Sequence, residues 1–375
     1  MAANNRIFYA CQMVGFRKAF EDGTPTVAKG VQSVGITTNF NLEQAFELGQ
    51  IQIYENIEGL PDVEVTMEKV LDGYALLFHL ASSAAGSNGL VGRSKARADV
   101  HLGVYSDEKD AVTDNVATAP DVEVYCSGMF MGSVSYTIPV DGNATESVTL
   151  VGNNKEWRTG GTRKLTHAGT GFGTDSPKAL TDASGGIQRR ENVLLSRSII
   201  PRGVYGVGQT TTTGNALNGG TFPAVHMQNI SLSTDFSRED ILELGRRTPY
   251  FRAPGFPIEV TCDIEAIAIS GDFISAFEEG DPALYSGTAS GDNTAEEYIV
   301  IALQDGTVFD LGIKNRLSSV SYGGGDAAGG NVSITYSYTN FNDFDVCQTQ
   351  DPGLALNGGL FNYTPSQSGY IAPTS

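Results

Sequence analysis

Apolar and polar residues alternate strictly in two stretches of the chain, residues 63–67 and 258–264. A period of two places every second side chain on the same face of a β-strand. Each stretch follows a Gly-x-Pro turn, and a strand-like run precedes it, at residues 31–40 in the first case. The pattern predicts a sheet with one face in the core and the other facing water or a partner.

The two stretches belong to a longer repeat. Adding 196 to each position between Gln32 and Pro61 reaches a second copy, with ten identical residues in the ungapped window. Residues 134–136 match 320–322 at an offset of 186, because the first copy has longer loops, and loops tolerate insertions. The identical pairs are Gln32/Gln228, Thr38/Thr234, Phe40/Phe236, Glu43/Glu239, Glu47/Glu243, Leu48/Leu244, Gly49/Gly245, Tyr54/Tyr250, Gly59/Gly255 and Pro61/Pro257.

The remaining pattern predicts a mainly β fold with short helices. Further strands are expected at 6–14, 100–105, 193–200 and 298–303, and closing hairpins lead into 148–150 and 332–334. A short helix is predicted at 43–48 and again in the second copy, capped by Asn41 or Ser237 and ended by Gly49 or Gly245. A longer helix is predicted at 74–80, with its counterpart at 272–277.

The repeat divides the chain into two homologous β modules. The first is predicted to span residues 1–157 and the second 191–349, with a loosely held C-terminal arm at 350–375. A Gly/Thr-rich linker at 158–190 separates them. Because residues 157–190 hold six basic and two acidic side chains, this segment carries +4 in a chain of −19. It is read either as a flexible linker or as a contact for an acidic surface on a neighbouring subunit. Its basic residues are Arg158, Arg163, Lys164, Lys178, Arg189 and Arg190.

The composition and motifs argue against catalysis. The net charge of −19 disfavours a protein that grips nucleic acid, which needs a basic face. The four histidines lie in unrelated contexts, and the four cysteines are too far apart for a zinc site, so they are expected to be isolated core thiols. Glu43 and Glu47 share a helix face in the predicted helix, but no pocket-forming pattern accompanies them. We therefore expect no enzyme activity, no cofactor and no metal.

The sequence shows no features of a signal peptide or of a membrane span. The N-terminal residues lack the basic and apolar regions of a signal peptide, and no apolar run approaches the length of a membrane span. These features predict folding in a cytoplasm without a membrane span.

The arrangement resembles the tail tube proteins of long-tailed bacteriophages. The resemblance rests on the strand Asn-Asn-Arg-Ile-Phe-Tyr near the N-terminus, the twin Thr-(Asn/Asp)-Phe…Glu-Leu-Gly segments, and the alternating strands after Pro61 and Pro257. It implies two tandem β-sandwich or split-barrel modules whose sheets join those of neighbours to line a hollow cylinder. With two modules in a chain, three chains would form a pseudo-sixfold ring, and the rings would stack into a tube in the virion tail. The implied partners are the chain itself, other tail proteins and DNA that passes without specific binding.

The alternating strands then suggest a lining for that tube. Acidic side chains on a lumen-facing strand surface would repel DNA phosphates, whereas ordinary solubility explains them equally well. The candidates are Glu64, Glu68, Glu259, Asp263 and Glu265, and the basic linker residues are the candidate ring-to-ring contacts. Alternative functions are another tail component such as a terminator, decoration or baseplate protein, a non-viral injection-tube subunit, and a β-fold glycan hydrolase.

Overall fold

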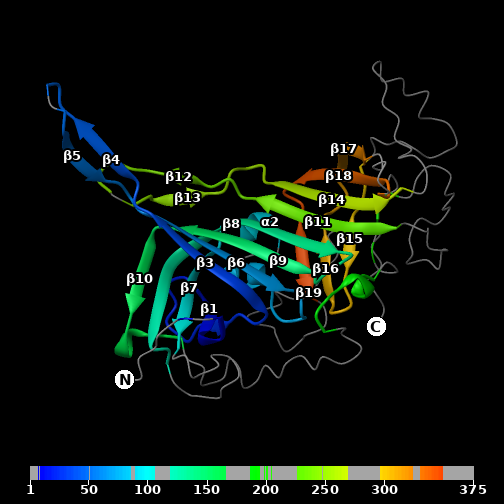
Figure 1. Ribbon diagram of the computed structural model, residues 1–375, viewed down its shortest axis with the longest axis horizontal. Coiled ribbons are helices and arrows are strands. Elements are labelled where there is room, and N and C mark those ends of the chain that lie inside the picture. The colour runs from blue at the N-terminus through cyan, green and yellow to red at the C-terminus, as the bar shows by residue number, and fades with distance from the viewer. Residues whose placement is uncertain are drawn as a thin grey trace.

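The computed structural model is built mainly of antiparallel strands (Figure 1). It describes residues 7, 9–49, 51–85, 89–105, 119–165, 186–194, 198, 200–201, 204, 226–246, 248–268, 296–323 and 330–348. The helices are short: α1 (Leu77–Ala81), α2 (Leu90–Arg93), and the 3-10 turns η1 (Tyr9–Cys11), η2 (Gly160–Thr162) and η3 (Arg190–Asn192). The strands are β1 (Gln12–Lys18), β2 (Thr26–Val27), β3 (Val31–Asn39), β4 (Leu42–Phe46), β5 (Ile53–Glu58), β6 (Asp62–Val70), β7 (Arg97–Val104), β8 (Val122–Pro139), β9 (Thr145–Gly152), β10 (Asn154–Arg158), β11 (Met227–Asp235), β12 (Glu239–Ile241), β13 (Phe251–Ala253), β14 (Glu259–Ile267), β15 (Val300–Ala302), β16 (Thr307–Asp310), β17 (Arg316–Gly323), β18 (Ser333–Phe341) and β19 (Asp345–Gln348).

One sheet of 12 strands runs through the whole molecule. Four strands of the first half lie in the order β3–β6–β9–β8, and four of the second half lie in the matching order β11–β14–β18–β17. The C-terminal half of β8 pairs with β11 and joins the two sets (Figure 1). The N-terminal half of β8 instead pairs with β7 and β10, and β7 leads on to β1 and β2. Three small sheets, β4–β5, β12–β13 and β15–β16–β19, complete the described fold.

Irregularities of the backbone recur at the offsets that the sequence repeat has. A bulge lies between Val31 and Ser33 in β3, and another lies between Met227 and Asn229 in β11, 196 positions later. The β8–β9 and β17–β18 pairs have bulges between 131 and 133 and between 317 and 319, an offset of 186. Bulges are specific features of a fold rather than defects. The two sets of four strands therefore share both their order and their local geometry.

The core lies on one side of this sheet. On β6 the side chains of Val63, Val65 and Met67 are buried while the residues between them are exposed, and β14 alternates in the same way. The alternating pattern thus predicted both strands and their inward faces correctly. Each fully buried aliphatic side chain contributes about 1.5–3 kcal/mol. Buried residues from both halves form one cluster, so the halves share a core.

The short helices predicted after β3 and β11 are wrong. Residues 42–46 and 53–58 form the β4–β5 hairpin, and β12 and β13 form its counterpart. Asn41 and Ser237 adopt positive φ values of 47° and 41° in place of a helix cap, and Gly49 and Gly245 turn the hairpins with φ of 94° and 86°. A helix of one or two turns is unstable in water without an apolar face to bury, and the residues of β4 are mostly exposed. A hairpin that extends the β3–β6 pair keeps the backbone hydrogen-bonded instead.

Other predicted elements differ in their bounds. The N-terminal strand begins at Gln12 rather than at residue 6, because its partners on β7 pair with Gln12 to Lys18, and η1 precedes it. Its expected counterpart at 193–200 forms no strand in the described residues, where Val193 makes one isolated bridge to Leu303. The helix predicted at 74–80 is present as α1, but the one at 272–277 lies outside the described residues.

Candidate functional site: an acidic face on the sheet

The outward side of the eight central strands presents rows of hydroxyl and carboxylate side chains. One row crosses from the first half to the second through successive cross-strand partners: Glu68, Ser147, Ser135, Ser233, Thr261 and Thr339. Within it the hydroxyl oxygens of Ser233 and Thr261 lie 2.6 Å apart. A second row consists of Thr137, Ser231, Asp263 and Ser337. Because these residues alternate with buried apolar ones, all of them lie on the same face.

We call this surface the acidic face. All five acidic residues singled out from the sequence lie on it: Glu64 and Glu68 are exposed on β6, and Glu259, Asp263 and Glu265 follow one another on β14, partly or fully exposed. Sequence reasoning missed two more, Asp62 at the start of β6 and Asp235 at the end of β11, both exposed. The alternation of these two strands, with 63, 65 and 67 buried in β6 and 230, 232 and 234 buried in β11, could have revealed them.

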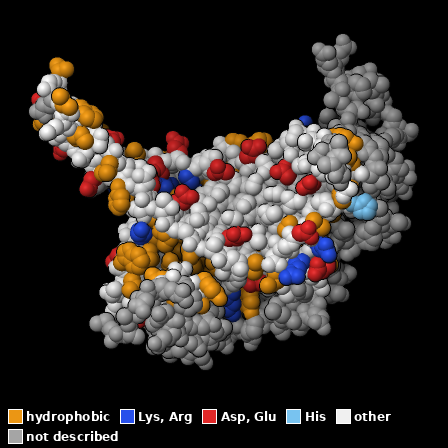
Figure 2. All heavy atoms as spheres, in the orientation of Figure 1, with side chains coloured by type: hydrophobic (Ala, Val, Ile, Leu, Met, Phe, Trp, Pro, Cys, Tyr) orange, Lys and Arg blue, Asp and Glu red, His pale blue; other side chains and the backbone are white. Residues whose placement is uncertain are grey.

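In the described residues, cations reach the acidic face at two places on its margin: Arg316 is exposed on the edge strand β17, opposite Thr339, and Arg252 pairs with Asp62 at 2.8 Å. None of the outward positions on β3, β6, β9, the C-terminal half of β8, β11, β14 or β18 is Lys or Arg. Figure 2 shows acidic side chains spaced over a largely uncharged surface in the middle of the sheet. Hydroxyls keep such a surface hydrated, and the carboxylates give it one sign of charge. Away from its margin, this arrangement can repel a polyanion and offers it no anchoring group.

A buried carboxylate behind the acidic face holds the helix beneath the sheet. Glu146 on β9 accepts hydrogen bonds from the backbone amides of Leu77 and Phe78, at 2.6 and 2.9 Å, and from the Tyr136 hydroxyl at 3.0 Å. Burial raises the pKa of Glu146, although these hydrogen bonds and Lys69 oppose the rise. Its three donors identify Glu146 as a structural group that fixes the start of α1.

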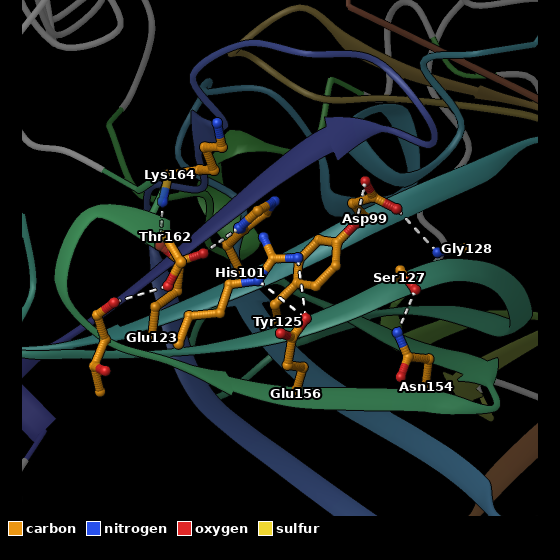
Figure 3. Close-up of polar contacts among 12 residues, drawn as sticks. Asp99, His101, Glu123, Tyr125, Ser127, Gly128, Asn154, Glu156, Thr162 and Lys164 are labelled. Carbon is orange, nitrogen blue, oxygen red and sulfur yellow. Dashed lines mark hydrogen bonds and ion pairs between the residues drawn. The ribbon is translucent and has the colours of Figure 1, made fainter.

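A second buried network lies beside the N-terminal half of β8 (Figure 3). Glu123 Oε1 is 2.7 Å from His101 Nδ1, and Glu123 Oε2 accepts hydrogen bonds from the backbone amides of Lys164 and Leu165, both at 2.8 Å. Burial by itself raises the pKa of Glu123, but the hydrogen bonds from His101 and the two amides hold that pKa below its ordinary value. The network therefore fastens the chain after β10 onto β8.

Two of the predicted contact residues, Arg158 and Arg163, lie close to this network. The Arg158 guanidinium lies 3.5 Å from the centre of the Tyr125 ring and forms an ion pair with Glu156 at 3.1 Å. Arg163 donates to the carbonyl oxygens of Pro120 and Asp121. Both side chains thus have partners within the chain, whereas Lys164 is exposed.

Two more of the basic residues, Arg189 and Arg190, lie at the other end of β8. Arg189 donates to Asn143 Oδ1 at 3.0 Å, and Arg190 is 3.9 Å from Asp141 in an exposed ion pair. Lys178 lies outside the described residues. The structure therefore divides the predicted basic contact into two groups, one at each end of β8, and does not bring them together.

The described part of the chain offers little for other chemistry. It contains no group of three or more His, Cys, Asp or Glu residues that could hold a metal ion. All four cysteines are buried and unbridged, which confirms the prediction of isolated core thiols. Among the helices of the described residues, none has the length and apolar character needed to cross a bilayer.

Comparison with known proteins finds similar chains among solved structures. No protein-family model matches the chain, and no curated protein does. A chain from the tube-terminating cap of the anti-feeding prophage is 15% identical, with a TM-score of 0.30, and the match covers 43% of this chain and 95% of that one. A chain from the baseplate of the anti-feeding prophage is 10% identical, with a TM-score of 0.31 and coverages of 41% and 97%. A chain from the sheath-tube complex of an extracellular contractile injection system is 13% identical, with a TM-score of 0.30 and coverages of 42% and 95%. The likeness is coarse, and under half of this chain suffices to cover each of these chains almost whole.

Proposed function

We propose that copies of this chain join into rings that stack as a hollow tail tube, with the acidic face lining the lumen through which a genome passes. The observation that carries the proposal is the acidic face itself: a continuous sheet surface whose described outward positions hold seven carboxylates and a single cation, Arg316 on the edge strand β17. The resemblance of the sequence to phage tail tube proteins supports the same reading.

Electrostatics explains why a conduit would have this surface. Duplex DNA carries about one negative charge per 1.7 Å of its axis, and proteins bind it by placing Lys and Arg against the phosphates. A lumen with seven carboxylates to one such residue per chain gives DNA little to attach to. At physiological salt, charges act over about 8 Å, so the carboxylates repel DNA that approaches the wall and leave DNA at the axis largely unaffected.

The two halves of the chain fit a ring. Their matching strand order and bulges support the interpretation that one module was duplicated and fused. Three chains would then place six equivalent sheets around a lumen. Because cyclic symmetry uses the same two surfaces on each copy, one kind of contact closes the ring. Lys164, Arg189 and Arg190 are our candidates for contacts between rings.

Electron microscopy of the purified full-length chain tests the tube directly. Hollow tubes of constant width are expected, whereas solid particles or discs that never stack would favour another tail component.

The lumen is tested by DNA retention on filters at low salt. Tubes of the Glu68→Lys/Asp263→Lys variant should bind linear DNA in a salt-dependent manner, because their lumen has gained cations. Tubes of the matched control Glu21→Lys/Asp22→Lys, changed on the turn before β2, differ equally in charge but outside the acidic face. Equal retention by both variants would show that the acidic face does not line the lumen.

A further inference from the structure

Among the described strands, the two outermost of the eight central ones, β3 and β17, each have one edge without a pairing partner. Within the described residues β3 pairs with β6 alone, and β17 pairs with β18 alone. Exposed strand edges are sites of pairing with other chains unless they are covered. The sequence equivalents of these two strands, β11 at an offset of 196 and the C-terminal half of β8 at 186, pair with each other inside the chain. We call the pairing of β8 with β11 the formed joint. The chain also carries β17 and β3, the two strands that would make a second joint of the same kind.

Residues at the formed joint are buried, whereas the equivalent residues on β17 and next to β3 are exposed, as expected if a second joint is missing. Phe236 and Phe40 are identical residues of the repeat, yet Phe236 is 0% exposed at the formed joint and Phe40 is 62% exposed at the open edge. On the other strand, Tyr136 is 1% exposed and its equivalent Tyr322 is 52% exposed. The open edges thus expose the aromatic side chains that the formed joint buries. A second copy of the same chain supplies the missing cover, because its edges are the complementary ones.

We infer that β17 of one copy pairs with β3 of the next in the register of the internal β8–β11 joint. This inference rests on the proposed ring and adds its residue-level contact. In the formed joint Ser135 lies opposite Ser233, and Tyr136 lies opposite Leu232. Moving the first strand by 186 and the second by −196 gives the corresponding partners. Ser321 then lies opposite Thr37, Tyr322 opposite Ile36, and Val320 opposite Thr38.

The hairpins next to the joint support the same geometry. The β12–β13 hairpin follows β11 and is held on the first half of the chain, where Arg252 pairs with Asp62 at 2.8 Å and Arg238 donates to the carbonyl oxygens of Met131 and Ser94 at 2.7 and 2.6 Å. The equivalent β4–β5 hairpin follows β3 and projects from the body (Figure 1), with hydrophobic side chains visible along it (Figure 2). In the inferred contact it lies over the second half of the copy whose β17 pairs with this β3. Its exposed apolar residues are Leu42, Phe46, Leu48, Ile51, Ile53, Tyr54 and Ile57.

Cysteine cross-linking of the full-length chain tests the register. Residues directly opposite each other in antiparallel strands have Cα atoms about 4.5–5.5 Å apart, within the reach of a disulfide, and diagonal neighbours at about 7–8 Å are outside it. The Thr37→Cys/Ser321→Cys variant should link copies into covalent oligomers on mild oxidation. The control Thr37→Cys/Ser319→Cys is displaced by two residues on the same face. We expect about tenfold less cross-linked product from it, because it forms only diagonal pairs. The Ser135→Cys/Ser233→Cys variant has the same geometry within the chain and should form an intrachain disulfide.

The outcomes separate the joint from the proposed function. Oligomers from the 37/321 variant that are rare in the 37/319 control support the inferred register. Preferential linking of the 37/319 pair overturns the register. Tubes that form while neither pair links, with the 135/233 disulfide present, overturn the joint but leave the tube proposal standing. A chain that neither links nor assembles overturns both.

Discussion

The imidazole of His79 ties the two halves of the chain together, and its protonation is expected to weaken the fold by a calculable amount. His79 lies on α1 in the first half and is 1% exposed, and its Nε2 is 2.8 Å from the carbonyl oxygen of Val346 on β19 in the second half. Burial and the nearby Arg93 guanidinium lower the pKa of His79 from 6.5 to about 3. Since the folded pKa lies below the unfolded one, the full stability is present above about pH 6.5 and is lost as the pH falls. One pH unit corresponds to 1.36 kcal/mol for one proton, so the loss between pH 6.5 and 5.0 is about 2 kcal/mol.

A variant that cannot titrate isolates this contribution. His79→Gln keeps an N–H donor for the Val346 carbonyl but binds no proton in this range. Burial raises the pKa of Glu146 and of Asp345, which gives them the opposite effect on stability as the pH falls, but they are present in both proteins. Urea unfolding of dilute, unassembled protein at pH 7.5 and pH 5.0 gives the free energy of unfolding. Between these two values the wild type should lose about 2 kcal/mol more than the variant. Equal losses would show that His79 is not buried as a neutral group between the halves.

Three further substitutions test other contacts. Glu123→Gln should lower the free energy of unfolding at pH 7 by about 3 kcal/mol, because a buried charged acceptor is lost. Since the pKa of Glu123 is held low, its stabilisation is present above about pH 4.5 and declines as the pH falls further, so the difference in Tm between wild type and variant should be smaller at pH 4 than at pH 7. Reversing the exposed charges of Arg189 and Arg190 to Glu should leave closed rings that stack poorly, and tubes of normal length in electron micrographs would contradict that role. Leu48→Asp/Leu244→Asp, at the two hairpin tips, should leave monomer stability within about 0.5 kcal/mol of wild type and reduce stacking, as measured by thermal melts and tube length.

Alternation in the sequence was sufficient to predict the strands that carry the acidic face. In β6 and β14 the buried and exposed positions follow a period of two without exception over 62–68 and 259–266, so Glu64, Glu68 and the three acids of β14 could be assigned to one side. The pattern around Asn41 and Gly49 predicts a helix incorrectly, because a residue suited to capping a helix also adopts positive φ in a strand-to-hairpin bend. The β-branched residues Ile51, Ile53 and Ile57 after the turn were the signal for a hairpin.

No local sequence pattern predicts which polar side chains are buried. Glu146 is fully buried although it stands among hydroxyl residues in β9, because its donors Leu77 and Phe78 lie 69 and 68 positions away. Glu123 is buried for the same reason, since Lys164 and Leu165 return to it from beyond β10. Local sequence gives the period of a strand, but only the tertiary fold supplies the donors that allow a carboxylate to be buried.

Comparing equivalent positions in the two halves separates two kinds of contact. Phe40 is exposed and Phe236 is buried, so a contact that exists in only one half within a single chain accounts for that pair. The hairpin tips behave differently, because Leu48 and Leu244 are both fully exposed and Tyr54 and Tyr250 are 63% and 62% exposed. The β8–β11 joint within the chain leaves the tip of the β12–β13 hairpin exposed to solvent. The same joint between copies would therefore leave the tip of each β4–β5 hairpin exposed as well. Large apolar side chains at regular intervals around a ring need cover from elsewhere. In a stacked tube the next ring is the surface that can provide it, and the tips are therefore expected to matter for stacking but not for ring closure.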